Sequence, residues 1–216
     1  MYNLLRKDIL VQKNSLWFCV GYSIFIFFAF SGPTFRPLIY VMGATVIAYV
    51  LVLSAIQAEF KNNSDLILLS FPVKRQQVVA SKYIGVLIFT FIALAVIGLL
   101  GLILSFCPLP FPTRLINWTD AVITVISVML LTSIYLPIYY KTAGRWVQII
   151  NAIVFMVIFF VPSSLVNLAS HQQILWLEET ASQNPWLLTV LALAIMGIIF
   201  YASYLISLRI YQRKDF

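Results

Sequence analysis

The stretch EFKNNSDLILLSFPVKRQQVVASKYIG, residues 59–85, is the one long part of the chain with the character of a water-exposed loop. It carries six charged side chains: Glu59, Lys61, Asp65, Lys74, Arg75 and Lys82. The sequence on either side of it is almost continuously apolar. Charged side chains are costly to place in a bilayer core, so this stretch separates membrane-buried segments and decides how they are counted.

The composition of the whole chain agrees with this interpretation. Of its 216 residues, 62% are apolar and only 10% are charged, whereas soluble domains carry roughly a quarter of charged residues. No polar segment exceeds the length of one loop, which leaves no room for a second, soluble domain. We therefore expect an all-α, polytopic membrane protein that forms a single domain over residues 1–216.

The apolar runs predict six transmembrane helices, because a helix needs about 20 mostly apolar residues to cross a bilayer core. The six runs are Leu16–Phe30, Leu38–Ile56, Ile84–Phe106, Ala121–Ile138, Val147–Val161 and Trp186–Leu208. The first and fifth are short and are expected to extend into their flanks. Residues 1–14 mix apolar and charged side chains, which is typical of a helix lying in the membrane interface; a frayed tail is the alternative.

The positions of Lys and Arg orient these six runs. If the runs cross the membrane in turn, twelve of the fourteen Lys and Arg residues fall on one side, and only Arg36 and Arg114 fall on the other. Cytoplasmic loops carry the excess of Lys and Arg, so both termini and the loop 59–83 are predicted to be cytoplasmic. The net charge of +7 is thus a topology signal. We expect no nucleic-acid partner, because the charge is divided among four segments.

Motifs that carry catalysis or bind metal are missing from the sequence. There is no GxxxxGK[ST] loop to hold a phosphate, and the one histidine, His171, makes neither a metal site nor a catalytic triad. The two cysteines, Cys19 and Cys107, are too few for a disulfide framework. We therefore expect no enzyme activity, no metal site and no cofactor in this chain, so that any transport would draw its energy from elsewhere.

The middle of the stretch 59–85 has the pattern of a short helix. Asn63 or Ser64 can cap its N-terminus, Asp65 is favourable in its first turn, and Pro72 cannot continue it. A new helix is expected from about Gln76 into the third span. The apolar side chains of the short helix either form an exposed docking surface or fold back on the membrane, and the sequence leaves both open.

The order E…DLILLSFPVKRQQVVASKY resembles the cytoplasmic loop of ABC-transporter permeases of the type 2 (export) class, in particular the small six-span permeases. In that family a Glu closes the second span, a D-L stretch and an S-x-P-V-x-R turn follow, and S-K-Y begins the third span. The matching residues here are Glu59, Asp65, Leu66, Ser70, Pro72, Val73, Arg75, Ser81, Lys82 and Tyr83. PIYYKTAGRW (137–146), with Ala143 inserted before Gly144, and the tail SLRIYQRKDF (207–216) are looser matches.

The resemblance implies that the short helix is a coupling helix that docks in a cleft of a separate ATP-binding subunit. The residues implied to form this contact are Glu59, Asp65, Leu66, Leu69, Ser70, Phe71, Pro72, Val73, Lys74 and Arg75. Two permease copies and two ATP-binding subunits, which bind ATP and Mg²⁺, are implied as well. Similarity to exporters of phenol-soluble modulins and antimicrobial peptides implies an amphipathic peptide substrate and a bacterial cell membrane.

Several residues have more than one interpretation at this point. Glu59 either pairs with Lys61, Lys74 or Arg75, holding the loop in register with the bundle, or is a solvated charge at a helix end. Pro137 is expected to end the fourth span. Polar residues within the spans are expected to hydrogen-bond to neighbouring helices; they are Thr124, Ser127, Ser133, Gln148 and Asn151.

Two other functions compete with the permease. A non-transporting membrane scaffold or sensor needs only six packed spans and a cytoplasmic docking loop. An intramembrane enzyme needs ionisable pairs at depth, and the apolar runs contain almost none. The sequence therefore favours an export permease, keeps the scaffold or sensor as the alternative, and disfavours the enzyme.

Overall fold

The structure is a computed structural model, and the residues that it describes are 2–30, 38–61, 75–106, 115–142, 152–153, 156 and 185–213. Within these ranges every regular element of any length is a helix: α1 (Tyr2–Val11), α2 (Lys13–Ala29), α3 (Ile39–Lys61), α5 (Arg75–Phe106), α6 (Trp118–Thr142) and α9 (Pro185–Gln212). The all-α prediction therefore holds for the described part of the chain.

Four of the six predicted spans correspond to helices long and apolar enough to cross a membrane. These are α3, α5, α6 and α9, and α5 begins at Arg75, close to the expected Gln76. The first predicted span is α2, which is 17 residues long and reaches a spanning length only together with α1, from which it is bent by 60°. The fifth, Val147–Val161, lies outside the described residues except for 152–153 and 156. The described helices thus account for four or five spans.

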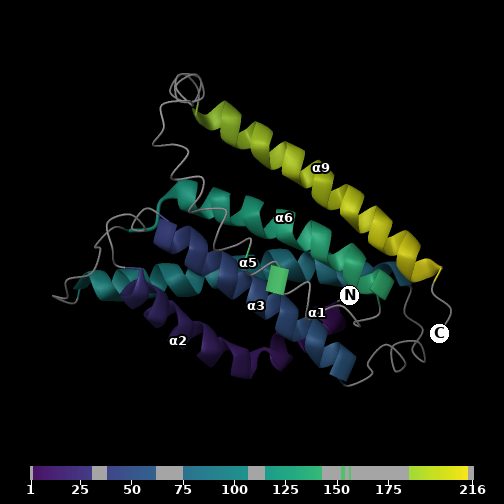
Figure 1. Cartoon of the computed structure of the whole chain (residues 1–216), viewed down its shortest axis with the longest axis horizontal. Coiled ribbons are helices and arrows are strands. Elements are labelled where there is room, and N and C mark those ends of the chain that lie inside the picture. The colour runs from purple at the N-terminus through teal and green to yellow at the C-terminus, as the bar shows by residue number, and fades with distance from the viewer. Residues whose placement is uncertain are drawn as a thin grey trace.

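Helix α3 lies at the centre of the bundle. It packs against α2, α5 and α6, and α6 in turn packs along α9 (Figure 1). Every residue from Ile39 to Tyr49 is buried, whereas α9 exposes large apolar side chains such as Trp186, Val190 and Ile198. A helix that is apolar on all sides is buried either inside a protein or against lipid. Helix α3 is an example of the first case and α9 of the second.

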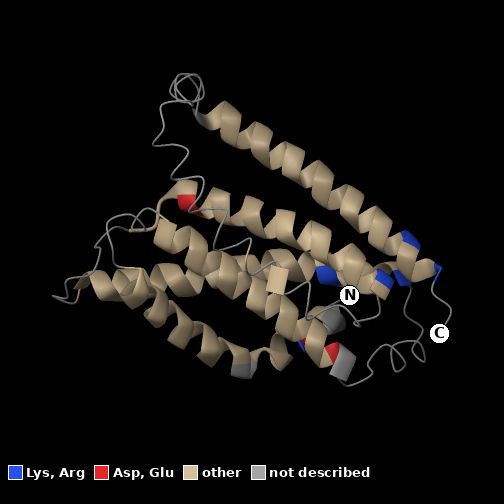
Figure 2. Cartoon of the chain, in the orientation of Figure 1, with Lys and Arg blue, Asp and Glu red and all other residues tan. Residues whose placement is uncertain are grey.

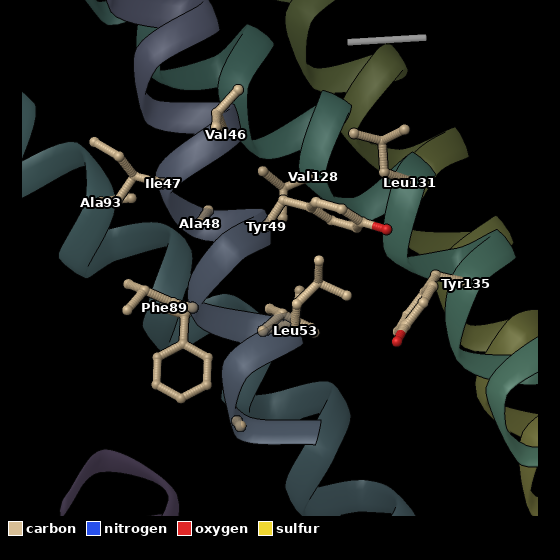
Figure 3. Close-up of a cluster of buried hydrophobic side chains, with 14 of the residues drawn as sticks. Val46, Ile47, Ala48, Tyr49, Leu53, Phe89, Ala93, Val128, Leu131 and Tyr135 are labelled. Carbon is tan, nitrogen blue, oxygen red and sulfur yellow. The ribbon is translucent and has the colours of Figure 1, made fainter. Parts of the chain in front are cut away.

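The core between α3, α5 and α6 is built from aliphatic and aromatic side chains (Figure 3). The rings of Tyr49 on α3 and Tyr135 on α6 meet edge to face with centroids 5.9 Å apart, a preferred geometry for aromatic pairs. Near the C-terminal end of α5, a Cβ atom at Gly101 would collide with the ring of Tyr40 on α3. Glycine therefore allows α3 and α5 to approach closely there, as small residues do between membrane helices.

The expectation that Pro137 ends the fourth span is wrong, because α6 continues through Pro137 to Thr142. Proline has no backbone N–H, so the carbonyl of Ser133, four residues earlier, lacks its normal helical donor. Ser203 on α9 donates its hydroxyl to this carbonyl at 2.7 Å. A neighbouring helix thus satisfies the group that the proline leaves free, which is how membrane helices tolerate proline.

The charged side chains gather at one end of the bundle (Figure 2). This end contains α1, the C-terminal ends of α3, α6 and α9, and the first turns of α5, and it holds the basic residues Lys7, Lys82, Lys141 and Arg209. Asp120, in the first turn of α6, lies at the opposite end. The segregation of Lys and Arg that the sequence predicted is therefore present in the described helices.

Candidate functional site

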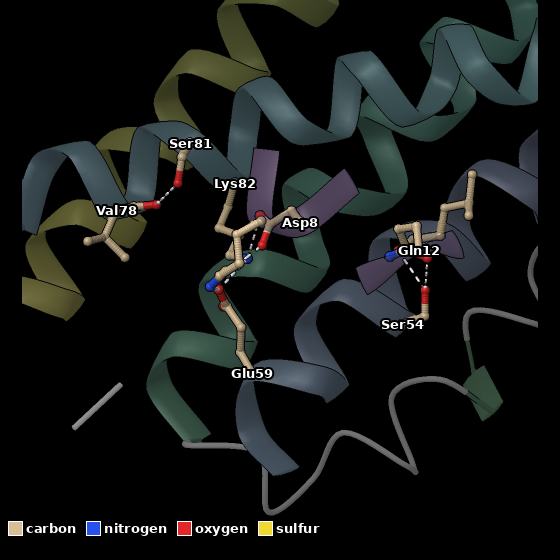
Figure 4. A network of polar contacts seen from close by, with 9 residues as sticks. Asp8, Gln12, Ser54, Glu59, Val78, Ser81 and Lys82 are labelled. Carbon is tan, nitrogen blue, oxygen red and sulfur yellow. Dashed lines mark hydrogen bonds and ion pairs between the residues drawn. The ribbon is translucent and has the colours of Figure 1, made fainter. Parts of the chain in front are cut away.

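Four charged side chains meet where α1, the end of α3 and the beginning of α5 come together (Figure 4). The Lys82 ammonium lies 2.9 Å from Asp8 Oδ2 and 2.8 Å from Glu59 Oε1. Lys7 Nζ lies 2.5 Å from the same Glu59 oxygen and 3.7 Å from Asp8 Oδ1. We call Lys7, Asp8, Glu59 and Lys82 the ion-pair cluster; it joins three helices that are distant in sequence.

The ion-pair cluster is buried, and its charges balance. The side chains of Asp8, Glu59 and Lys82 are at most 10% exposed, while that of Lys7 is 36% exposed. The space beside Asp8 and Lys82 is lined by apolar residues, among them Val52, Ile56, Phe89 and Leu136. Charges in such surroundings must be paired, and removal of one partner leaves an uncompensated buried charge. Two ammonium groups facing two carboxylates meet this requirement.

The ion-pair cluster bridges the two ends of the segment 62–74, which connects α3 to α5 in the sequence. Glu59 lies in the last turn of α3, and Lys82 lies two turns into α5. A further contact holds the start of α5: the guanidinium of Arg75 donates to the carbonyl of Gln212, at the end of α9, at 2.7 Å. The base of the segment is thus attached to α1, α3, α5 and α9 at once.

Gln12, which lies between α1 and α2, makes a second attachment to α3. Its amide nitrogen donates to the Leu51 carbonyl at 2.7 Å, and its amide oxygen accepts from the Ser54 hydroxyl at 2.6 Å (Figure 4). Asp8 and Gln12 are both buried, whereas Ile9 and Leu10 are exposed. The exposed side of α1 thus carries these apolar side chains together with Arg6, a mixture that suits contact with the membrane interface.

A chain of hydroxyl groups extends these attachments to α6 and α9. The Tyr83 hydroxyl lies 2.8 Å from the hydroxyls of Ser203 and Ser207. Ser203 uses its hydrogen on the Ser133 carbonyl, so Tyr83 must donate to Ser203, and Ser207 must donate to Tyr83. The carbonyl that Pro137 leaves free thus fixes the donor and acceptor of every hydrogen bond in this chain of hydroxyl groups. These bonds hold Tyr83, next to Lys82, against α9.

A double-mutant cycle tests this chain. Ser203→Ala is expected to lower the free energy of unfolding by about 1–3 kcal/mol, because it leaves the Ser133 carbonyl and the Tyr83 hydroxyl short of partners. In a Pro137→Ala background, the restored N–H satisfies the Ser133 carbonyl, and the same change is expected to cost about 1 kcal/mol less. Unfolding titrations in mixed detergent micelles measure both values. Equal costs in the two backgrounds would show that Pro137 and Ser203 are not coupled.

Of the ten residues that the sequence analysis assigned to the coupling contact, the structure describes Glu59 and Arg75 alone. The other eight lie outside the described residues: Asp65, Leu66, Leu69, Ser70, Phe71, Pro72, Val73 and Lys74. The suggestion that Glu59 is a solvated helix-end charge is wrong, since this side chain is buried.

The partners expected for Glu59 also differ from those found. The structure pairs it with Lys7 and Lys82, neither of which had been considered. Arg75 donates to a carbonyl of α9, and the side chains of Lys61 and Lys74 lie outside the described residues. Sequence reasoning also missed Asp8. One signal was available, namely opposite charges placed at the edges of three apolar segments, because such charges need partners when buried.

The polar residues within the spans were assigned partly wrong roles. Thr124 and Ser133 donate their hydroxyls to carbonyls of their own helix, those of Asp120 and Leu130. Apart from the ion-pair cluster, side-chain hydrogen bonds between helices are made by Tyr83 and Ser203, and Gln12 bonds to α3; the sequence analysis assigned this role to none of these three residues. Gln148 and Asn151 lie outside the described residues.

Comparison with known protein families gives one match. Residues 3–212 match the family model described as "ABC-2 family transporter protein". No curated protein and no solved structure matches the chain. The matched range covers nearly the whole sequence and contains the complete ion-pair cluster and the segment 62–74.

Proposed function

The chain belongs to the ABC-2 transporter family, and from this premise we propose that it is the permease of an ATP-driven exporter that is moved through the segment 62–74. Membership makes it a membrane permease subunit and implies partnership with an ABC ATP-binding subunit. The proposal adds where that partner docks, how its motion reaches the helices and what is exported.

The observation that carries the proposal is the ion-pair cluster at the base of the segment. A push on a loop moves the attached helices together only if both ends of the loop are fixed to each other. The contact of 2.8 Å between Lys82 and Glu59 makes this connection, and Asp8 adds α1 to it. Arg75 and Tyr83 continue the connection to α9. Transmission of motion between distant sites requires a packed unit that can adopt two discrete arrangements. Helices fixed to one another in this way can form such a unit.

The docking surface itself is proposed from the sequence. The residues that would contact the ATP-binding subunit are Arg75 and Asp65, Leu66, Leu69, Ser70, Phe71, Pro72, Val73 and Lys74, while the buried Glu59 would hold the base of the segment. An apolar set flanked by charges is the composition of a protein interface. ATP and Mg²⁺ would be bound by the partner subunit and not by this chain, and a second permease copy would complete the transporter.

The proposed substrate is an amphipathic peptide, of the phenol-soluble modulin or antimicrobial-peptide type. The described helices are apolar along most of their length, and a pathway with such walls suits amphipathic molecules better than hydrophilic ones. The gathering of Lys and Arg at one end of the bundle (Figure 2) supports an orientation with both termini in the cytoplasm. The bacterial cell membrane is proposed from the resemblance of the sequence alone.

Transport into inverted membrane vesicles tests the proposal. The vesicles come from cells that produce this chain together with the ATPase that co-purifies with it. We expect ATP-dependent uptake of a fluorescently labelled amphipathic helical peptide. A scrambled peptide of the same composition and a non-hydrolysable ATP analogue should give no uptake. An associated ATPase without peptide uptake would exclude this substrate class, and the absence of any ATPase would favour a scaffold or sensor.

A further inference from the structure

An open hollow lies along the outward side of α1. Its volume is about 510 Å³, and its lining includes Arg6, Lys7, Leu10 and Val11. Residues four apart are neighbours on a helix surface, so Arg6 lies beside Leu10, and Lys7 lies beside Val11. The side of the helix that faces the bundle carries Asp8, which is buried. The hollow thus combines two cations with two apolar side chains on one face of α1.

The two cations of the hollow have hydrogen-bond donors left for a ligand. Arg6 is exposed, and among the residues that the structure describes its guanidinium has no hydrogen-bond or ion-pair partner. The ammonium of Lys7 has three N–H donors. Glu59 accepts one of them, and Asp8, at 3.7 Å, lies beyond hydrogen-bond distance. Because the side chain of Lys7 is 36% exposed, its other donors can reach an anion in the hollow.

The charges around the hollow do not cancel. In the ion-pair cluster two ammonium groups face two carboxylates, so the cluster as a whole is neutral. Arg6 adds one positive charge, and the described part of α1 carries no acidic residue other than Asp8 to balance it. A phosphate diester, which carries one negative charge, therefore matches the charge that remains.

Contacts along α1 give the depth of each part of the hollow. Lys7 bonds to Glu59, in the last turn of α3, at the charged end of the bundle. Gln12, next to Val11, bonds to the carbonyl of Leu51, which lies eight residues before Glu59 and therefore about 12 Å further from that end. The cations of the hollow thus lie near the end of the bundle, and its apolar side chains lie deeper. A phospholipid of the same leaflet places its phosphate and its acyl chains in this order.

We propose that this hollow binds an anionic phospholipid of the adjacent leaflet, with its phosphate on Arg6 and Lys7 and an acyl chain along Leu10 and Val11. Guanidinium groups are well matched to phosphate oxygens, and basic patches beside membrane helices attract anionic headgroups. A zwitterionic lipid would bring its own cation close to Arg6 and should bind more weakly. The site adjoins the ion-pair cluster through Lys7, but its test needs neither the ATP-binding subunit nor an exported substrate.

Native mass spectrometry of the purified chain tests the headgroup part of the proposal. The protein is titrated with phosphatidylglycerol and with phosphatidylcholine of identical acyl chains, and phosphatidylglycerol should bind more tightly. Arg6→Gln should weaken the binding of phosphatidylglycerol about fivefold, the contribution of one basic residue near a membrane surface. Arg209→Gln removes an exposed arginine of α9 at the same end of the bundle and should have no effect. Equal binding of the two lipids by the unaltered chain, or equal losses in the two variants, would overturn the proposal.

A second pair of variants tests the acyl-chain part. Leu10→Gln should weaken the binding of both lipids about threefold, because the acyl chain loses an apolar contact. Leu187→Gln is the matched control, since Leu187 on α9 is 62% exposed and Leu10 is 64% exposed, and it should leave binding unchanged. Thermal unfolding in detergent verifies that all variants are folded. Glycerol phosphate, which has no acyl chain, should not bind detectably in the same titration; if it binds as tightly as phosphatidylglycerol, the hollow is a site for a free phosphate and the proposal fails.

Discussion

Replacing Lys82 with methionine is expected to lower the free energy of unfolding by about 3–5 kcal/mol, the range for breaking a buried ion pair from one side. Lys82 is the one buried cation of the ion-pair cluster and contacts both carboxylates. Without it, Asp8 and Glu59 share only Lys7, whose side chain is 36% exposed. Methionine fills a similar volume, so the expected decrease in the free energy of unfolding results from the missing charge and not from lost packing.

Two comparisons make this test specific. Lys141→Met changes an exposed lysine in the last turn of α6 and should alter stability by no more than about 0.5 kcal/mol. Adding Asp8→Asn and Glu59→Gln to Lys82→Met removes the uncompensated charges, and should recover most of the lost stability. Unfolding titrations in mixed micelles measure all three variants. If Lys82→Met were as stable as Lys141→Met, the ion-pair cluster would not contribute to the fold as described.

The second large effect is expected on transport and not on stability. Glu59→Ala disconnects α3 from α5 at the base of the segment 62–74, yet Lys82 keeps Asp8 as its partner and Lys7 can turn to solvent. The fold and the docking surface should therefore persist. Peptide uptake per ATP hydrolysed should fall at least tenfold, since the motion of the segment would no longer reach α3 and α5 together.

Uptake and hydrolysis are to be measured on the same inverted vesicles. Glu178→Ala is the control, because Glu178 belongs to a loop predicted on the outer side of the membrane, and its uptake per ATP should equal that of the unaltered chain. The amount of captured ATP-binding subunit should be the same for both variants. If the Glu59→Ala variant transports as much peptide per ATP hydrolysed as the unaltered chain, the ion-pair cluster takes no part in transmitting the motion of the segment 62–74.

Long apolar runs made most of the spans predictable, because the requirement for about 20 apolar residues leaves little choice. The helices α3, α5, α6 and α9 follow from this alone, and the distribution of Lys and Arg predicted which of their ends lie together. The first span was less predictable. Its run is short, and at the bend of 60° between α1 and α2 Gln12 bonds to the carbonyl of Leu51, a contact between residues far apart in the sequence that local patterns do not reveal.

The details of the site could not be predicted for a related reason. Local rules correctly state that proline lacks a donor, but the group that replaces this donor at Pro137 comes from Ser203, on another helix. Likewise, Glu59 had nearby cations in the sequence, yet Lys7 and Lys82 reach it through packing of α1 and α5 on α3. Burial sets these pairings, because it selects the partners that neutralise a charge away from water.

Capture of the ATP-binding subunit tests the central claim, that the segment 62–74 is where the partner drives this permease. The sequence offers a matched pair of changes, since Phe-Pro occurs at Phe71-Pro72 in this segment and at Phe111-Pro112 in a loop predicted on the other side. The tagged chain is solubilised and purified, and ATP hydrolysis is measured in the eluate. We predict that the unaltered chain and Phe111→Asp retain an ATPase, while Phe71→Asp retains at least tenfold less with unchanged elution of the membrane protein. Equal ATPase activity with Phe71→Asp and the unaltered chain would contradict the claim.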